Sequence, residues 1–550
     1  MDAPTPARPD LRPALRWARW ALVFLLVFTF LRGAVWSTTF PSFFGPDEDY
    51  HFLYAEYLTT QHALPSPDKP LYPREYPELV KAMDYDKYGG LGPPEFKGDP
   101  KASVRKTAKL PDSAREPFEV GRGVGIVHPP LYHAPAAVVN WSLGDASVFT
   151  RYHAVRWLTS LFGVLAVYAA WLLAAQVFRQ EPLRLLAAFL VAAQPMVALL
   201  AGIANHDSLV IATFTLATAF MLFLLRSPPR ARQGAWLGGA IALALLTKSS
   251  GLALLPLALL AYVLQALAHR GQLRVVARSA GLAGLVVAVG AGWWYLYAAL
   301  KYGNVSATVP PAEPVPGTPA GIGDLWNYTK DWVSLTYKTY WYHHFWYEAN
   351  PHARYFHVPL YVGLVAGAGL LVLVARNWRR PLAADRPLLR QILLMVLSAL
   401  ALFLPILALD LDHFVDGLGF SLTGGRYLLP AYPAVAVLMI LGVRQLTPRR
   451  VRPLVYAGAA LLAAYFCWVV WLREYVNRYY GLPETGWGER LRNMTYDRPE
   501  FVTATTLRIA IALVFLSLLA SAAAVVVGNL PPAARERLRR RPRVAGTAAP

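Results

Sequence analysis

The sequence is poor in cysteine and in charge. It has one cysteine, Cys467, in 550 residues, so no disulfide can form within the chain. Charged residues make up 16% of the total and hydrophobic residues 56%, a balance that does not suit a soluble globular chain. The sequence also lacks a convincing small-residue cleavage site after its first apolar run. We therefore expect that run to stay as a membrane anchor, and Cys467, which lies in another apolar run, to be a lipid-facing or packing residue rather than a reactive one.

What the sequence has in abundance is long apolar runs. An α-helix needs about 17–25 such residues to cross roughly 30 Å of hydrocarbon. Little polar sequence separates most runs, so we predict one all-α membrane domain over residues 1–528, with about twelve spanning helices. Residues 529–550 would form a basic tail. The clearest runs are Ala21–Val35, Leu158–Val177, Leu185–Ala201, Leu209–Leu225, Leu252–Leu267, Gly281–Leu300, Val358–Val374, Ile392–Leu409, Tyr427–Leu441, Leu454–Trp471 and Leu507–Val527.

The excess of basic residues indicates orientation in the membrane. The net charge is +20, which by itself would suit a nucleic-acid partner. However, the arginines gather in the short loops between apolar runs and before the first run, as the positive-inside rule predicts for cytoplasmic segments. We therefore expect both termini, including the arginine-rich stretch Arg535–Arg543, to be cytoplasmic. The expected partner is a lipid bilayer and not a nucleic acid.

One short apolar segment, Pro129–Leu143, decides the orientation of all later loops. If it crossed the membrane, five arginine-rich loops would face outward, against the positive-inside rule. The segment also contains His133, Pro135 and Asn140, so we interpret it as interfacial or re-entrant. Three long loops then face outward, at residues 37–152, 301–357 and 473–503, together with the turns at 205–207 and 410–426 and with Lys248.

The first outward loop begins with consecutive acids at Pro46–His51. Pro46 and the carboxylates of Asp47, Glu48 and Asp49 also suit a helix start, because acids favour the first helical turn. Three adjacent carboxylates at a membrane surface are nevertheless costly unless they bind something. In a helix, Asp47 and His51 would share a face. This stretch is therefore a candidate catalytic motif, with a helix start as the alternative.

Further polar residues are predicted to reach the same side of the membrane. Asn205 and Asp207 lie in the second outward turn, where a helix cap is the alternative reading. Lys248 lies between two short apolar halves, and an ionisable group at such a position is a functional candidate, with a snorkelling lysine as the alternative. Arg426 follows two glycines, and its guanidinium suits a phosphate. The alternative role of Arg426, which Tyr427 follows directly, is anchoring at the membrane interface.

Two aromatic motifs are less specific. His128 and Tyr132 stand in the sequence His-Pro-Pro-Leu-Tyr, and residues 340–347 read Tyr-Trp-Tyr-His-His-Phe-Trp-Tyr. Aromatic belts at membrane interfaces have the same composition, and sugar-binding sites also use aromatic faces. The pair His343 and His344 lacks a cysteine or a spaced carboxylate, so it is a poor metal signal.

In this order the motifs resemble those of the GT-C superfamily, multi-span glycosyltransferases that use polyprenyl-phosphate sugars. They are an acidic motif after the first helix, His-Pro-Pro-Leu-Tyr, a Pro…Asn-x-Asp turn, a lone lysine and Gly-Arg-Tyr-x-x-Pro. The likeness is greatest to a bacterial branch with a Pro-Asp-Glu-x-x-His motif, related to protein O-mannosyltransferases and lipid A aminoarabinose transferases. It extends from the first helix to about Pro430.

The resemblance implies an inverting transfer on the outer face of a bacterial inner membrane, from a polyprenyl-phosphate sugar to a glycan, lipid or protein acceptor. Asp47 would be the general base and Asp207 the second acid, with Glu48 as a further catalytic residue. No cofactor is required, although the additional acid at Asp49 leaves a divalent cation near Asp47, Asp49 and Asp207 open. The substrate-binding residues would be His51, His128, Tyr132, Asn205, Lys248, Arg426 and Tyr427.

Two other classes of protein share the helical pattern. A transporter or flippase for lipid-linked sugars would also carry charges among its helices, but such folds commonly show inverted repeats with broken helices. No internal repeat is visible in this sequence. A structural assembly factor would not need the carboxylates. The clustering of polar residues on one side favours an enzyme.

Overall fold

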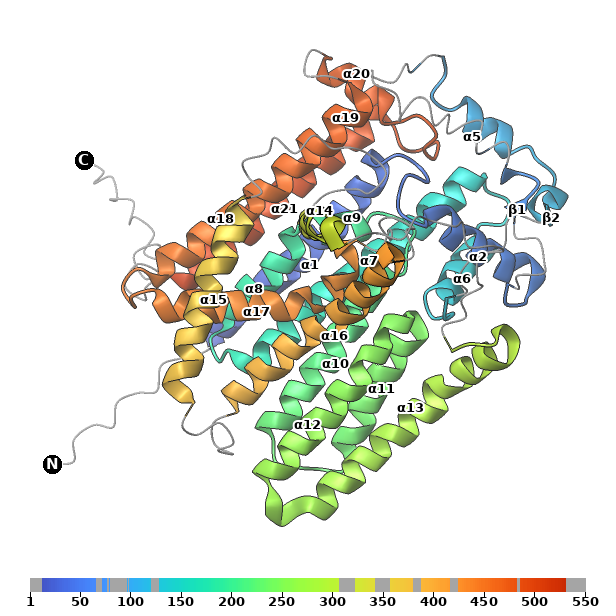
Figure 1. Cartoon of the computed structure of the whole chain (residues 1–550). Helices are drawn as coiled ribbons and strands as arrows, with labels where there is room; N and C mark the ends of the chain where they lie inside the picture. The colour runs from blue at the N-terminus through green and yellow to red at the C-terminus, as the bar shows by residue number, and fades with distance from the viewer. Residues whose placement is uncertain are drawn as a thin grey trace, which may run out of the picture.

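The computed structural model describes residues 12–65, 72–76, 79, 96, 98–119, 128–305, 322–341, 357–378, 387–415, 424–481 and 485–530. Within these ranges the chain is mostly helical (Figure 1). Ten of the described helices are long and apolar enough to cross a membrane. The predicted all-α membrane class is confirmed. The spans are formed by α1 (Arg12–Thr39), α7 (Val148–Val177), α10 (Asp207–Arg226), α12 (Leu254–Ala268), α13 (Leu273–Tyr302), α15 (His357–Asn377), α16 (Leu388–Val415), α17 (Tyr432–Leu446), α18 (Arg452–Val470) and α21 (Ala504–Asn529).

Three shorter apolar helices complete the bundle. Helix α8 (Glu181–Ala193) is followed by α9 (Pro195–Leu200), and the chain bends between them at Gln194, because a proline cannot continue the hydrogen bonding of a helix. Helix α11 (Arg232–Thr247) packs along α10 and α13. The described residues therefore contain ten candidate spans against the roughly twelve predicted, and α8–α9 and α11 are shorter than the length required of a span.

Several spans are extended by short helical turns of tighter or wider pitch. The 3₁₀ turn η2 (Ser249–Ala253) precedes α12, η3 (Arg270–Gln272) precedes α13, and η5 (Gly425–Ala431) precedes α17. The π-helical turn η6 (Trp471–Val476) joins α18 to α19 (Asn477–Tyr480). Two of these turns, η2 and η5, adjoin the charged residues described below.

Helix α10 forms the centre of the bundle, since 83% of its apolar window is buried, against 11% for α15. Small residues allow neighbouring helices to approach closely, as is common in membranes. Where α17 crosses α15, a Cβ atom on Gly442 would overlap the carbonyl oxygen of Ala366. This crossing fixes α17, and therefore the η5 turn that precedes it.

A cap of short elements covers one end of the bundle. It contains α2 (Glu48–Gln61), α5 (Ala102–Thr107), η1 (Asp112–Arg115), α6 (His133–Ser142), α14 (Ile322–Trp341) and α20 (Trp487–Asn493). The strands β1 (Tyr72–Pro73) and β2 (Pro117–Glu119) pair antiparallel, with Tyr72 opposite Glu119. In Figure 1, α2, α6 and the two strands lie together beyond the ends of α7 and α10.

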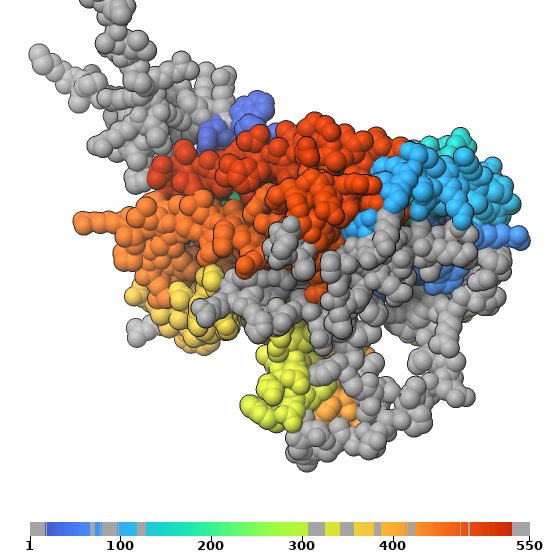
Figure 2. Space-filling view, turned by 90° about the horizontal axis from the view of Figure 1, so that it is seen from above, coloured from blue at the N-terminus to red at the C-terminus, as the bar shows by residue number. Residues whose placement is uncertain are grey.

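Two buried cations tie this cap together. The Lys101 ammonium lies 2.8–3.0 Å from the carbonyl oxygens of Thr495, Arg498, Pro499 and Val502. The Arg498 guanidinium in turn donates to the carbonyl oxygens of Thr38 and Phe40 at the end of α1. Figure 2 shows the light-blue segment around α5 lying against the orange-red segment around α20. The first and last polar loops therefore hold the end of α1 from which the acidic motif emerges.

Helix α6 occupies most of the segment Pro129–Leu143, on which the predicted sidedness of all later loops depends. It has ten residues, about 15 Å of helix, half of what the hydrocarbon layer requires. The interfacial position of this segment and the cytoplasmic position of the termini stay predictions. The stretch Arg535–Arg543 and the pair His343 and His344 lie outside the described residues.

Candidate functional site

Four charged residues from distant parts of the sequence meet at the capped end of the bundle. Asp47 precedes α2, Asp207 begins α10, Lys248 follows α11, and Arg426 lies in η5. They form two ion pairs. Asp47 Oδ2 lies 2.7 Å from Arg426 Nη2, and Asp207 Oδ1 lies 2.6 Å from Lys248 Nζ. The structure thus brings together the four charged residues that the sequence placed on one side of the membrane.

Tyr427 joins the two ion pairs. Its ring centroid lies 4.4 Å from Lys248 Nζ and 4.9 Å from the guanidinium carbon of Arg426. Both distances allow attraction between a cation and an aromatic face. Its hydroxyl also lies 3.1 Å from Arg426 Nη2. Asp207, Lys248, Arg426 and Tyr427 line one narrow crevice, together with Val210, Ile211, Ser250 and Pro430.

Asp47 is the exposed member of this site. Its side chain is 51% exposed, whereas that of Arg426 is 12% exposed. Its backbone has φ 58°, a left-handed conformation that aspartate and asparagine tolerate better than most residues. Burial alone would raise the pKa of the Asp47 carboxyl, but the charges of Arg426 and Lys248 hold that pKa below its ordinary value. The side chain is therefore an ionised carboxylate at neutral pH.

The Arg426 turn depends on the glycine before it. A Cβ atom on Gly425 would overlap the carbonyl oxygen of Thr336 in α14, so only glycine fits there. The Gly425 amide donates to Thr339 Oγ1 at 2.6 Å, which fixes η5 on α14. Arg426 Nη1 is buried and has no hydrogen-bond partner among the described residues. This nitrogen can therefore donate a further hydrogen bond.

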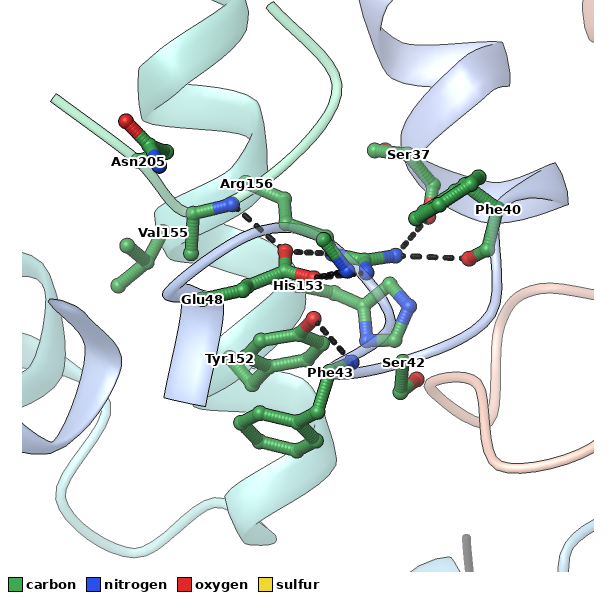
Figure 3. Close-up of polar contacts among 12 residues, drawn as sticks. Ser37, Phe40, Ser42, Phe43, Glu48, Tyr152, His153, Val155, Arg156 and Asn205 are labelled. Atoms are coloured by element: carbon green, nitrogen blue, oxygen red, sulfur yellow. Dashed lines mark hydrogen bonds and ion pairs between the residues drawn. The ribbon is translucent and has the colours of Figure 1, made fainter. Parts of the chain in front are cut away.

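Glu48, the neighbour of Asp47, is fully buried, and its carboxylate faces the Arg156 guanidinium (Figure 3). Its carboxylate accepts two hydrogen bonds from Arg156, both at 2.7 Å, and one each from the amides of Gly45 and Ala204. These four bonds use about all the acceptor sites of a carboxylate. The geometry argues against the expected catalytic role of Glu48.

Arg156 is the residue of this site that sequence reasoning missed. It lies in α7, is fully buried, and also donates to the carbonyl oxygens of Ser37, Phe40 and Pro41 (Figure 3). The charged residues in the first turns of this long apolar helix, Arg151 and Arg156, are a signal that could have found it. With Glu48 it shapes the loop from which Asp47 projects.

Asn205 and Tyr132 also hold the protein together. Asn205 Nδ2 donates to the Pro46 carbonyl oxygen at 2.8 Å, and its Oδ1 accepts from the Asp207 amide at 2.8 Å. It therefore links the two acidic segments. The Tyr132 hydroxyl is buried and lies 2.8 Å from Thr159 Oγ1. Both side chains are engaged within the protein, in contrast to their expected role in substrate binding.

Four histidines pack together beside the ion pairs and are called here the histidine cluster: His51, His128, His133 and His206. His51 Nδ1 lies 2.9 Å from His133 Nε2. The His206 ring centroid is 4.3 Å from that of His51 and 4.4 Å from that of His128. Burial, with the nearby Lys248 charge, lowers the pKa of His128 to about 3. Burial likewise holds the pKa of His51 and of His206 well below the ordinary value, so these rings are neutral at pH 7.

The acids considered as a cation site have separate partners. Asp47 pairs with Arg426 and Asp207 pairs with Lys248, whereas Asp49 Oδ2 accepts from the Tyr76 hydroxyl at 3.3 Å. Within the described ranges, no group of three ligand atoms close enough for one ion includes a carboxylate. A cation held by Asp47, Asp49 and Asp207 is therefore not favoured.

Fold and site together define a multi-span helical membrane protein with a charged crevice at one end of its bundle. The sequence matches the family described as "Predicted membrane protein (DUF2142)" over residues 30–435, well over half of the chain. The chain belongs to that family. No protein of curated function matches it.

Similar solved structures include ArnT from Cupriavidus metallidurans in the apo state, with 15% identity, a TM-score of 0.44, and coverage of 94% of this chain and 76% of that one. The same protein bound to undecaprenyl phosphate has 15% identity and a TM-score of 0.41, with coverage of 94% of this chain and 78% of that one. A third similar structure is the archaeal oligosaccharyltransferase AglB from Archaeoglobus fulgidus in complex with an inhibitory peptide and a dolichol-phosphate. It has 15% identity and a TM-score of 0.41, with coverage of 86% of this chain and 57% of that one. Likenesses at this level assign no residue, substrate or reaction to this chain.

Proposed function

We propose that the protein is a membrane glycosyltransferase that moves a sugar from a polyprenyl-phosphate donor to an acceptor hydroxyl on the outer face of the membrane. The observation that carries the proposal is the meeting of two carboxylate–cation pairs at the ends of spanning helices, where Asp207, Lys248 and Arg426 line one crevice and Asp47 pairs with Arg426. Such a set offers both a base for a hydroxyl and positive charge for a phosphate.

Asp47 is the proposed general base. Its half-exposed carboxylate can reach a hydroxyl arriving from solvent, and its lowered pKa keeps it in the form that accepts a proton. As the acceptor oxygen bonds to the anomeric carbon, its proton passes to Asp47. The sugar is attacked from the face opposite the phosphate, so its configuration inverts.

Lys248 and Arg426 are the proposed phosphate ligands. The bond between the anomeric carbon and the phosphate oxygen breaks with its electron pair on oxygen, so the lipid phosphate needs positive charge more than a proton. Arg426 Nη1 is a buried donor without a partner among the described residues, and Tyr427 fixes the spacing of the two cations. Fixed charges of this kind stabilise a transition state without reorganisation.

An apolar groove beside η5 supports a lipid-linked donor. It has a volume of about 170 Å³ and runs between α8, α15, α17 and α18. Gln194 and Tyr432, the residue that follows η5, are among the residues that line it. The groove suits an isoprenoid chain whose phosphate lies at Arg426. Its other lining residues include Leu186, Leu190, Trp341, Val362, Met439, Val455, Tyr456 and Phe466.

Glu48, Arg156 and Asn205 are assigned positioning roles in this proposal, since each holds the loop of Asp47 or the start of α10. A flippase is the alternative function. Transporter sites commonly lie near the bilayer midplane, at the interface between repeats. The ion pairs of this protein lie at helix ends, which favours a reaction at the membrane surface.

The test uses the purified full chain in lipid nanodiscs with a panel of radiolabelled polyprenyl-phosphate sugars and a cell-envelope extract as the acceptor. We expect consumption of one donor with release of polyprenyl phosphate. The Asp49→Asn variant should retain this activity and the Asp47→Asn variant should lose it. Transfer of intact donor across proteoliposomes without consumption would favour the flippase instead.

A further inference from the structure

The histidine cluster contains an arrangement that the proposed transfer reaction does not use. His51, His128 and His206 come from three separate segments, and their ligand atoms all lie within 4.8 Å of one another. His51 and His206 are almost completely buried, at 0% and 1% exposed. Three imidazoles that converge in the protein interior are an expensive feature if they only fill space, because phenylalanine or leucine would fill it without polar atoms.

Ring nitrogens of all three histidines are left without hydrogen bonds within the part of the chain that the structure describes. His51 Nε2, His128 Nδ1 and both ring nitrogens of His206 are buried without a hydrogen bond to any described residue. Leaving a buried polar atom unpaired costs about 1–3 kcal/mol. Neutral imidazoles offer lone pairs to a metal ion, and imidazole suits ions of the zinc, copper and nickel type.

His133 behaves as a supporting residue for this group. Its Nε2 lies 2.9 Å from His51 Nδ1, so it holds the His51 ring by one nitrogen, while His51 Nε2 has no hydrogen bond to a described residue. Metal-binding histidines are commonly oriented in this way by a partner on their second nitrogen. The unpaired His51 Nε2 is then the atom left for a ligand.

From these contacts we propose that His51, His128 and His206 bind one divalent transition-metal ion of the zinc class, and that His133 orients His51. Tetrahedral Zn–N bonds of about 2.0–2.1 Å place nitrogens about 3.3 Å apart. The three ligand atoms, now within 4.8 Å, need to converge by at most about 1.5 Å, which small rotations of the rings provide. Three protein ligands leave the fourth position for water or an anion, as in other open zinc sites.

The surrounding charges permit a dication. Asp207 Oδ1 lies 3.5 Å from His206 Nε2 and is itself paired with Lys248, and Asp47 is paired with Arg426. The negative charges of the two carboxylates balance the positive charges of Lys248 and Arg426. A bound dication would therefore not add to an existing excess of positive charge. The proposal concerns binding and does not depend on the transfer reaction.

The test measures binding alone. The full chain, purified without a polyhistidine tag and stripped with a chelator, is titrated with Co²⁺ while visible ligand-field absorption and bound cobalt are recorded. We expect one Co²⁺ per chain with the strong absorption of a tetrahedral site, displaced by Zn²⁺. His128→Gln and His206→Gln should each abolish stoichiometric binding, and His133→Gln should weaken it about 10- to 100-fold.

His153→Gln is the matched control, because His153 is equally buried but its Nδ1 donates to the Phe149 carbonyl oxygen of its own helix at 2.8 Å. It should bind Co²⁺ as the wild type does. Spin-echo spectroscopy of the Cu²⁺-loaded wild type counts its imidazole ligands directly and does not depend on the folding of variants. Three imidazoles are expected. No stoichiometric binding by the wild type, fewer than three imidazoles, or unchanged binding in both ligand variants would overturn the proposal.

Discussion

Replacing Glu48 by glutamine separates a positioning role from a catalytic one. The substitution keeps the size of the side chain but leaves the Arg156 guanidinium, which is fully buried, without its counter-charge. Removing one partner of a buried ion pair costs about 3–5 kcal/mol, because the other charge stays uncompensated. The NH₂ group of the glutamine would also point at an N–H donor of Arg156 or of the backbone, so two donors would face each other without an acceptor.

We therefore expect Glu48→Gln to lower the midpoint of thermal unfolding in detergent by several degrees, followed by intrinsic tryptophan fluorescence. Asp49→Asn is the control, since the Asp49 carboxylate accepts a 3.3 Å hydrogen bond from Tyr76 and forms no ion pair with any residue in the described ranges. Its midpoint should stay close to that of the wild type. A Glu48→Gln protein with wild-type stability but no transfer activity would refute the reasoning and return Glu48 to the catalytic residues.

Three further predictions follow from the charges. Lys248→Met and Arg426→Met should each weaken donor binding and slow single-turnover transfer, by about 10- to 150-fold for the loss of one charged hydrogen bond of roughly 1.5–3 kcal/mol. Lys101→Met should lower the unfolding midpoint, because four carbonyl oxygens lose their shared cation, whereas Lys109→Met, at an exposed position of the same loop, should not. Burial raises the pKa of Glu75 from 4.5 to about 7. Its contribution to stability is therefore present below about pH 4.5 and lost as the pH rises through 7, by up to about 1.4 kcal/mol per pH unit.

Each of these has a result that would count against it. Unchanged donor affinity and rate in both methionine variants at Lys248 and Arg426 would remove the phosphate site. Equal unfolding midpoints for the Lys101 and Lys109 variants would mean that the cap does not depend on the carbonyl contacts. For Glu75, the measurement is the midpoint at several pH values in wild type and Glu75→Gln, and equally steep profiles would contradict the assignment.

The bundle could be predicted from the sequence because the bilayer imposes a length and a polarity on each span. Ten of the eleven apolar runs named from the sequence fall in the candidate spans, Leu185–Ala201 is divided at Gln194 into α8 and α9, and loop charges alone led us to predict Asp47, Asp207, Lys248 and Arg426 on one side. Helix α11 was not among the named runs, since its sixteen residues are short for a span.

The pairing of side chains could not be predicted, since it depends on contacts between distant segments. Glu48 and Asp47 are adjacent in sequence, yet one faces Arg156 in the interior and the other faces Arg426 at the surface. The left-handed backbone of Asp47 separates the two directions, and no local pattern signals it. The histidine cluster likewise joins residues such as His51 and His133, 82 positions apart.

The most direct test of the central claim is the single-turnover rate of Asp47→Asn, measured together with its donor affinity. Asparagine tolerates the left-handed backbone at this position and keeps the size of the side chain, so the loop should fold unchanged. The account predicts that the chemical step slows about 10²- to 10⁴-fold, as is typical for loss of a general base, while donor binding is retained. A wild-type rate in Asp47→Asn, with Asp49→Asn as the reference, would contradict the assignment of Asp47 and the mechanism built on it.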